Sequence, residues 1–312
     1  MKISILLPVY NDTKSLINLV ENINLLYGKK ENIELNYFII NDGSNSSISK
    51  FFQNESNVTI LDLKSNQGNQ KAIYVGLSYL NDKNYEFDFL VIMDSDGEDN
   101  PKHITNLLNK AEQNKEKIIF ASRSERKEGF LFKIFYFFYK IIFKILTGKK
   151  INFGNFSCMS KNIIKSIITL PMIDIHYPSA IIKSKFEYLT IPLEKGKRYD
   201  GKSSMDIINF ILHAMKSLAV FNEQIITRIL VFSFMSIIIC TLSIFSVVIY
   251  KMTEPLLLAG WSTNVVIGFS IIGMIFLFMF FSCLLVLINK NTFIQNSNSD
   301  YKDLIKEISK KK

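Results

Sequence analysis

Four acidic side chains stand within six positions in the stretch DSDGED, directly after the apolar run FLVIM. Carboxylates this close repel one another unless a cation lies among them. Asp94 and Asp96 are two residues apart at the end of an expected strand, so both can point to one side, and Glu98 could join them if the chain stays extended. Such hard oxygen ligands suit Mg²⁺ or Mn²⁺, which share their remaining positions with water and phosphate oxygens. The stretch therefore predicts a metal site that holds a diphosphate, with a simple acidic turn as the alternative.

Strands and helices alternate over residues 1–120, and this pattern must position the acidic stretch. Helix-like segments separate the apolar runs, and strand and helix in alternation predict an α/β fold, a mostly parallel sheet flanked by helices. In such a sheet ligands gather at the carboxyl ends of the strands. The polar groups YND, NDGS and DSDGED all follow strands, so we expect them to line one crevice. The expected strands are 3–9, 35–40, 58–63, 87–93 and 117–121, and the expected helices are about 13–26, 69–80 and 101–115.

Two long segments near the end of the chain, 229–250 and 265–288, contain no charged residue. Each is long enough to cross the roughly 30 Å hydrocarbon layer as a helix. We therefore expect a two-helix transmembrane hairpin over 225–289, with a buried hairpin of a soluble protein as the alternative. Residues typical of headgroup anchors border the two segments: Arg228, Lys251, Trp261 and Lys290.

Lysines are concentrated in a basic tail, residues 290–312, whereas the connection 252–264 contains neither Lys nor Arg. Positive residues stay on the cytoplasmic side, so we expect a multi-pass protein of the cell membrane with both termini in the cytoplasm. The net charge of +9 fits contact with anionic lipid. No sequence motif favours nucleic acid as a partner, and the opening MKISILLPVYND has too short an apolar part for a signal peptide.

The segment 130–147 combines a wide apolar surface with a narrow cationic stripe. Lys133, Lys140 and Lys144 fall within about 40° of one another on a helix, and nearly all other positions are apolar or aromatic. A helix of this kind is expected to lie in the membrane interface. The alternative is a core helix whose lysines reach solvent. A second amphipathic segment, 203–222, precedes the first apolar segment and is expected at the interface too.

The stretches ISILLPVYND, FIINDGS, SNQGNQKAIYVGL, LVIMDSDGEDNP and KRYDGKSSM occur in an order that resembles family 2 glycosyltransferases. The likeness is to the polyprenyl-phosphate type, such as dolichol-phosphate mannose synthases. It implies a GT-A-type fold and a cytoplasmic catalytic domain over 1–222. It also implies an inverting enzyme that moves a sugar from a UDP- or GDP-linked donor to a polyprenyl phosphate. Homo-oligomer formation stays open.

The resemblance also implies roles for individual residues. Arg123 and Arg126 follow the fifth strand, where relatives place basic residues near the sugar or diphosphate, with solvated surface arginines as the alternative. Gly68 and Asn69 open a helix whose N–H groups could face phosphate, with a plain helix cap as the alternative. The implied nucleotide-binding residues are Pro8, Tyr10, Asp12, Asp42, Gly68, Asn69 and Asp94; the implied phosphate- or acceptor-binding residues are Arg123, Arg126, Lys197, Arg198 and Ser203; the implied catalytic residues are Asp96, Arg198 and Asn155.

The sequence departs from the family pattern where asparagines replace acids. Asn41 precedes Asp42 where an aspartate is usual, and Asn152 and Asn155 replace the acids of an Asp-x-Gly-Asp-Phe motif. Asparagine accepts no proton at neutral pH. Either no base is needed, or the base lies elsewhere, with Asp174 or His176 as candidates, or the reaction differs.

Three functions stay open on this sequence. A lipid phosphate is already anionic and can attack without losing a proton, which favours a polyprenyl phosphate as the acceptor. A sugar hydroxyl of a lipid-linked glycan would need a base. The third alternative is a membrane-bound scaffold that has lost catalysis.

Overall fold

The computed structural model describes residues 1–28, 30, 32–123, 130–200, 207–253, 260–288 and 300–310. The chain forms two compact units. The first comprises Met1–Val220 together with Ser299–Lys312, and the second comprises Phe221–Asn298. The chain therefore leaves the first unit, builds the second and returns to the first.

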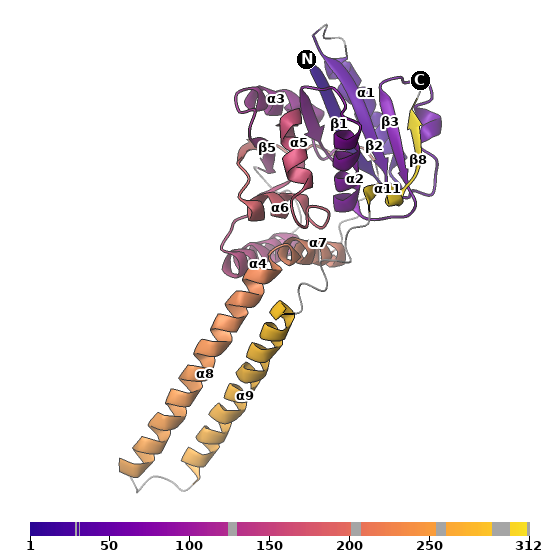
Figure 1. Ribbon diagram of the computed structural model, residues 1–312. Helices are drawn as coiled ribbons and strands as arrows, with labels where there is room; N and C mark the ends of the chain where they lie inside the picture. Colours follow the sequence, from indigo (N-terminus) through magenta and orange to yellow (C-terminus); the bar gives the residue numbers. More distant parts are fainter. Residues whose placement is uncertain are drawn as a thin grey trace. The chain divides into compact units, whose positions relative to one another are not determined.

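The first unit is built on an eight-stranded sheet of strand order β7-β5-β6-β4-β1-β2-β3-β8 (Figure 1). Neighbouring strands from β4 through β1 and β2 to β3 run parallel, whereas β6 and β8 pair antiparallel with their neighbours. The prediction of a mostly parallel sheet flanked by helices is confirmed. The strands are β1 Lys2–Val9, β2 Glu34–Asn41, β3 Val58–Leu63, β4 Phe89–Ile92, β5 Ile118–Arg123, β6 Phe153–Ser160, β7 Tyr188–Leu193 and β8 Ile305–Lys310.

Helices cover both faces of this sheet because successive strand residues point to opposite sides. Ile3, Ile5 and Leu7 of β1 belong to one buried cluster with residues of α1 and α3. Leu6 points the other way and meets α2 at Gly76, where a Cβ would collide with the leucine side chain. The helices are α1 Thr13–Tyr27, α2 Asn69–Asp82, α3 Ile104–Glu112, α5 Lys161–Ile168 and α6 Tyr177–Ser184, with short 3₁₀ turns η1 Ser49–Phe51 and η2 Pro101–His103.

Strand β6 inserts antiparallel between β4 and β5, which the sequence did not indicate. Its residues FGNFSCMS contain no long apolar run. The register places Ile92 of β4 opposite Ser157 of β6. Asp94 follows two residues after Ile92, and Nδ2 of Asn155 in β6 donates to its Oδ1 at 3.3 Å.

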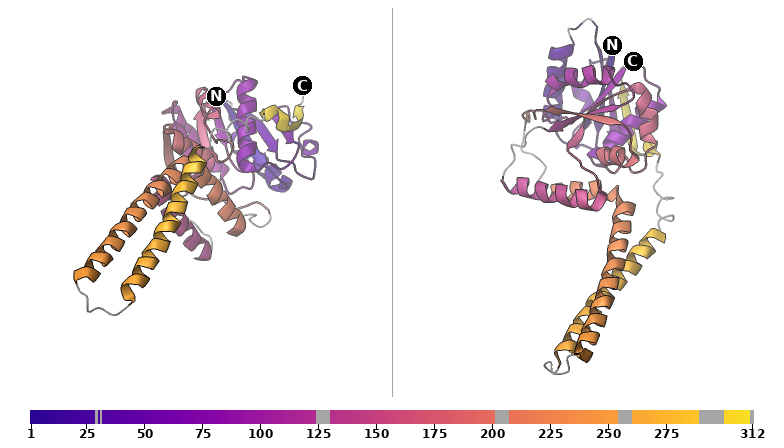
Figure 2. Two further views of the ribbon diagram at one scale, coloured as in Figure 1. Left: turned by 60° about the horizontal axis from the view of Figure 1, so that its bottom comes forward. Right: turned by 90° about the vertical axis from the view of Figure 1, so that its left-hand side faces the viewer.

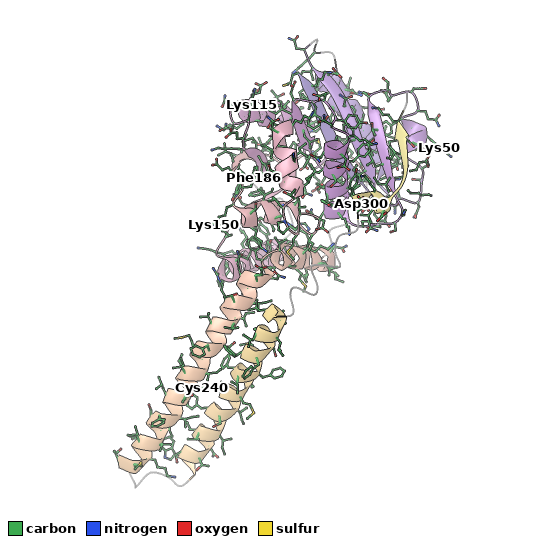
Figure 3. All side chains as sticks on the ribbon, in the orientation of Figure 1. Lys50, Lys115, Lys150, Phe186, Cys240 and Asp300 are labelled. Atoms are coloured by element: carbon green, nitrogen blue, oxygen red, sulfur yellow. The ribbon has the colours of Figure 1, made fainter. Side chains whose placement is uncertain are left out.

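Residues 300–310 return to the sheet, whereas the sequence predicted a basic tail over 290–312. The one-turn helix α11, Tyr301–Leu304, buries Tyr301, whose hydroxyl donates to Asp82 Oδ2 at 2.9 Å. Strand β8 then pairs with β3 and lies beside it at the sheet edge in Figure 1. Its sequence IKEISK carries lysines, which suit an exposed edge strand. Figure 3 labels Asp300 where this return begins.

Helices α4, Phe130–Thr147, and α7, Ile207–Ala219, lie side by side in the first unit (Figure 2). Tyr139 of α4 and Ser217 of α7 share a hydrogen bond of 2.7 Å. Phe143 of α4 and Phe210 of α7 are buried. The opposite faces are apolar and exposed. These exposed residues are Ile134, Phe137, Phe138, Ile141, Ile142 and Ile145 of α4 and Ile208, Ile211, Leu212 and Met215 of α7.

The second unit consists, as far as it is described, of two paired helices, α8 Asn222–Thr253 and α9 Trp261–Ile288. Their most apolar stretches have mean hydropathies of 2.4 and 2.7, and only 11% and 0% of the residues in these stretches are buried. Apolar side chains project outward along both helices in Figure 3, where Cys240 marks α8. Both helices are candidate membrane spans, and their exposed apolar surface does not resemble the buried hairpin of a soluble core.

Candidate active site

The candidate site forms at the carboxyl ends of β4, β1, β2 and β3. These strands are adjacent and parallel, so the loops that follow them meet at one edge of the sheet. The loop after β1 is bound to the loop after β2, because the N–H of Asn11 donates to Ser44 Oγ and the N–H of Asn45 donates to Asn11 Oδ1, both at 2.9 Å. Tyr10 in the same loop is 49% exposed, whereas Pro8 is buried inside β1.

Asp42 fastens the loop after β2 to the start of α2. Its carboxylate accepts from the backbone N–H groups of Gln67 at 2.6 Å and Gly68 at 2.8 Å. Burial raises the pKa of Asp42, and these two amides and the charge of Lys216 oppose the rise. Gly68 is the N-cap of α2 with φ of 88°, a conformation that favours glycine. Asp42 therefore positions Gln67 and Gly68, which we call the glycine loop, and its contact with a nucleotide stays a prediction.

Asn41 takes part in the same framework. Its Nδ2 donates to Asp62 Oδ1 at 2.5 Å, and its Oδ1 accepts from the N–H of Ser44 at 3.2 Å. An aspartate at this position would face the carboxylate of Asp62. The asparagine thus fits the local charge.

Asp94 and Asp96 approach each other at the end of β4. Burial, followed by the charge of Asp94, raises the pKa of Asp96 to about 6, while Arg198 acts in the opposite direction. The guanidinium of Arg198 lies 3.1 Å from Asp96 Oδ2 and 3.2 Å from Asp12 Oδ2. The guanidinium of Arg198 thus joins the loops after β1 and β4.

The segment 195–200 carries Arg198 and packs directly on the acidic loop. The N–H of Gly196 donates to Glu98 O at 2.8 Å, and the N–H of Tyr199 donates to Asp96 O at 3.0 Å. Gly97 has φ of 87°, and a Cβ there would run into the ring of Tyr199. This glycine therefore allows the close approach that places Arg198.

Side-chain amides surround Asp94 on its other side. Nδ2 of Asn69 and Nδ2 of Asn155 donate to Asp94 Oδ1 at 2.9 and 3.3 Å. Gln70 in turn donates to Asn155 Oδ1 at 3.0 Å. Gln70 was not predicted as a site residue, because a glutamine inside a helix carries no signal of its own in the sequence.

The predicted metal set is only partly assembled. Glu98 pairs with Lys195, with 2.8 Å between Oε2 and Nζ, while its charge also contributes to the raised pKa of Asp96. Among the residues that the structure describes, no group of three or more His, Cys, Asp or Glu side chains is arranged to hold a metal.

The predicted basic residues are only partly described. Arg123 ends β5 and Lys197 is exposed beside Arg198. Arg126 and Ser203 lie outside the described residues. Lys216 of α7 was not predicted as a site residue, yet its Nζ lies 3.7 Å from where a Cβ of Gly68 would be.

His176, a candidate base, is buried and caps α6. Its Nδ1 accepts from the N–H of Ser179 at 3.2 Å, so the ring proton is on Nε2 and is donated to His213 Nε2, also at 3.2 Å. Burial, then the charges of His213 and Lys216, lower the pKa of His176 well below 6.5. Asp174, the other candidate, is half-buried.

Residues 4–168 match the protein family described as Glycosyl transferase family 2. The chain belongs to this family. The family prediction made from the five sequence stretches is thereby confirmed, and the site described above lies largely within the matched residues.

Curated relatives of this family 2 chain are distant. An uncharacterized glycosyltransferase, YkcC of Bacillus subtilis (strain 168), is 23% identical over 88% of the chain and 85% of its own length. The undecaprenyl-phosphate 4-deoxy-4-formamido-L-arabinose transferase of Photorhabdus laumondii is 24% identical over 67% of the chain. The chain spans 65% of the length of that second relative, slightly under two thirds.

Two solved structures share the fold. Mannosyl-3-phosphoglycerate synthase from Rubrobacter xylanophilus has a TM-score of 0.52 and 12% identity, over 71% of the chain and 72% of its own. Glucosyl-3-phosphoglycerate synthase from Mycobacterium tuberculosis, in complex with Mn²⁺, uridine-diphosphate and glucosyl-3-phosphoglycerate, has a TM-score of 0.53 and 11% identity, over 72% and 79%.

We expect His176 to lower the stability of the first unit as the pH drops below about 6.5, whereas Asp96, whose pKa is raised to about 6, contributes in the opposite direction. The pKa of His176 is depressed in the folded state, so the unfolded chain takes up the proton first, and acid favours unfolding. Thermal unfolding of the full chain between pH 7.5 and 5 measures this. His176→Asn keeps a helix-capping side chain without a titrating group and should flatten the slope. An unchanged slope in this variant would show that other groups cause it.

Proposed function

We propose that this chain is a membrane-bound glycosyltransferase that moves a sugar from a nucleoside-diphosphate donor to a polyprenyl phosphate. The observation that carries the proposal is the paired Asp94 and Asp96 at the strand ends, with Arg198 held against them. This is a site with charges of both signs, suited to a diphosphate. The printed name of the Photorhabdus relative, an undecaprenyl-phosphate transferase, supports the lipid acceptor.

The donor set fits a divalent cation. Two carboxylates are enough for Mg²⁺ or Mn²⁺ when diphosphate oxygens and water complete the ligands. Asp94 and Asp96 would hold it, and Glu98 would not, because Lys195 engages its carboxylate. A bound cation would neutralise charge on the leaving diphosphate. The Mn²⁺ in the glucosyl-3-phosphoglycerate synthase complex supports this choice.

Arg198 would also bind the diphosphate of the donor. Its guanidinium is divided between Asp12 and Asp96. A diphosphate offers oxygens in a geometry that a guanidinium binds through two parallel hydrogen bonds. Arg198 would therefore exchange carboxylate for phosphate when the donor enters, and leave Asp96 to the cation. Exposed Lys197 adds positive charge beside it.

The side chains around the site favour a phosphate acceptor over a hydroxyl. Asn155 carries no titrating group, and His176 is buried with both ring nitrogens engaged. Neither is therefore poised to take a proton from a sugar hydroxyl. A phosphate monoester attacks the anomeric carbon as an anion, and a single displacement inverts that carbon.

The exposed apolar faces of α4 and α7 suit contact with the membrane interface. On α4 the exposed residues recur at spacings of three and four, so they form one stripe, opposite the buried Phe143. Lys140 and Lys144 are exposed beside the stripe, at the level where lipid headgroups would lie. A lipid acceptor held there would reach the site of the same unit.

The return of β8 supports a hairpin topology. Because β8 is hydrogen-bonded to β3, the chain on both sides of α8 and α9 belongs to the first unit. If α8 crosses the membrane, α9 must cross back. Both termini therefore lie on one side, which we assign to the cytoplasm from the lysine distribution.

The purified chain should transfer sugar from a UDP- or GDP-linked donor to polyprenyl phosphate and yield a product that mild acid cleaves. Asp96→Asn should abolish the transfer, because one charge of the cation site is lost, and Asp88→Asn, at the opposite end of β4, should leave it unchanged. Thin-layer analysis of radiolabelled product measures both. A product on a glycan hydroxyl would contradict the acceptor, and absence of any transfer or donor hydrolysis would favour a scaffold.

Cysteine labelling should place both ends of the chain in the same compartment. A cysteine placed at residue 1 and another at residue 312 should both resist a membrane-impermeant thiol reagent in intact cells, whereas one in the connection 254–259 should react. Cells opened with detergent provide the control for reactivity. Labelling of only one terminus in intact cells would contradict the hairpin.

A further inference from the structure

A chain of side-chain amides links the backbone of α6 to Asp94, and its hydrogen bonds can run in only one direction. The N–H of Tyr177 donates to Gln70 Oε1 at 2.7 Å, and a backbone N–H can only donate. Nε2 of Gln70 donates to Asn155 Oδ1, and Nδ2 of Asn155 donates to Asp94 Oδ1. An ionised carboxylate can only accept, so the two ends fix the orientation of both amides.

The start of this chain is held firmly. Gln70 is 6% exposed, and Tyr177 is fully buried with its hydroxyl 3.1 Å from Ser157 Oγ. A buried amide that satisfies a backbone N–H cannot turn without leaving a buried group unpaired, which is costly. Gln70 is thus locked with its nitrogen toward Asn155.

The two oxygens of Asp94 are consequently unequal. Oδ1 accepts from both Asn69 and Asn155, whereas no hydrogen bond reaches Oδ2 from the part of the chain that is described. Both donors are neutral, so they orient the carboxylate without cancelling its charge. Asp96 differs, because the cation of Arg198 faces it.

We propose that Gln70 is a positioning residue of the donor site. It turns the amide of Asn155 toward Asp94, and the carboxylate then presents Oδ2, with its full charge, to a divalent cation. Asn155 accordingly acts on Asp94 and is not a substitute for a base. The inference rests on the proposed function for the identity of the ligand, a metal-bound nucleoside diphosphate.

The test is a double-mutant cycle on the full chain, with Mn²⁺ titrated by calorimetry in the presence of UDP or GDP. Gln70→Met and Asn155→Ala should each weaken Mn²⁺ binding about tenfold or more, as is usual when a partner of a metal ligand is lost. Because Gln70 acts through Asn155, the double variant should bind Mn²⁺ no more weakly than Asn155→Ala alone.

A third variant separates orientation from packing. Gln70→Glu keeps the size and an acceptor for Tyr177, but removes the donor, so Asn155 must turn its oxygen toward Asp94. We expect a loss at least as large as for Gln70→Met. Gln113→Glu adds the same charge at the exposed end of α3 and should bind Mn²⁺ like the wild type. Thermal unfolding shows that each variant is folded.

The proposal is overturned if Gln70→Met lowers the Mn²⁺ affinity equally in the wild type and in Asn155→Ala. It is also overturned if a folded Gln70→Glu variant binds Mn²⁺ as tightly as the wild type. Its failure can be told from that of the proposed function. If the chain transfers sugar to lipid phosphate but its Mn²⁺ affinity does not depend on Gln70, only the role of Gln70 is contradicted. If the Mn²⁺ affinity depends on Gln70 but lipid phosphate is not an acceptor, only the proposed acceptor is contradicted.

Discussion

Repulsion between carboxylates at one edge of the sheet is the constraint on which the rest of this site depends. Asp12, Asp94 and Asp96 come from two loops that adjacent parallel strands bring together. The single positive charge of Arg198 is shared between Asp12 and Asp96, and neutral amides surround Asp94. This arrangement keeps the loops in place while it leaves negative charge for a cation. A bound diphosphate with its metal would satisfy the same charges in another way, which is how the fold can bind and release its donor.

The surrounding structure serves to hold these groups in register. Asp42 ties the glycine loop to β2, and Gly97 lets the segment with Arg198 approach the acidic loop. Antiparallel β6 brings the amide of Asn155 within hydrogen-bond distance of Asp94, and α2 contributes Asn69 and Gln70. Helices α4 and α7 belong to the same unit, so an acceptor at their apolar faces would be within the domain that we propose to bind the donor.

Local sequence patterns predicted the central strands, the acidic pair and the two apolar helices, because each depends on a periodicity or on charge within a few residues. The partners of those residues depend on tertiary contacts. Glu98 sits two residues from Asp96, and its carboxylate pairs with Lys195, which is nearly 100 residues away in the sequence. Strand β6 has too few apolar residues to be recognised, and β8 reads as a charged tail until β3 offers it an edge. Lys216 lies on a helix that the sequence marks only as amphipathic, and its place beside Gly68 appears only in three dimensions.

The exchange of partners at Arg198 can be observed directly in crystals of the full chain grown with Mn²⁺ and UDP or GDP. The account predicts an anomalous manganese signal between the carboxylates of Asp94 and Asp96, with the guanidinium of Arg198 on the diphosphate. A nucleotide bound without metal at either carboxylate, with Arg198 still between Asp12 and Asp96, would contradict it.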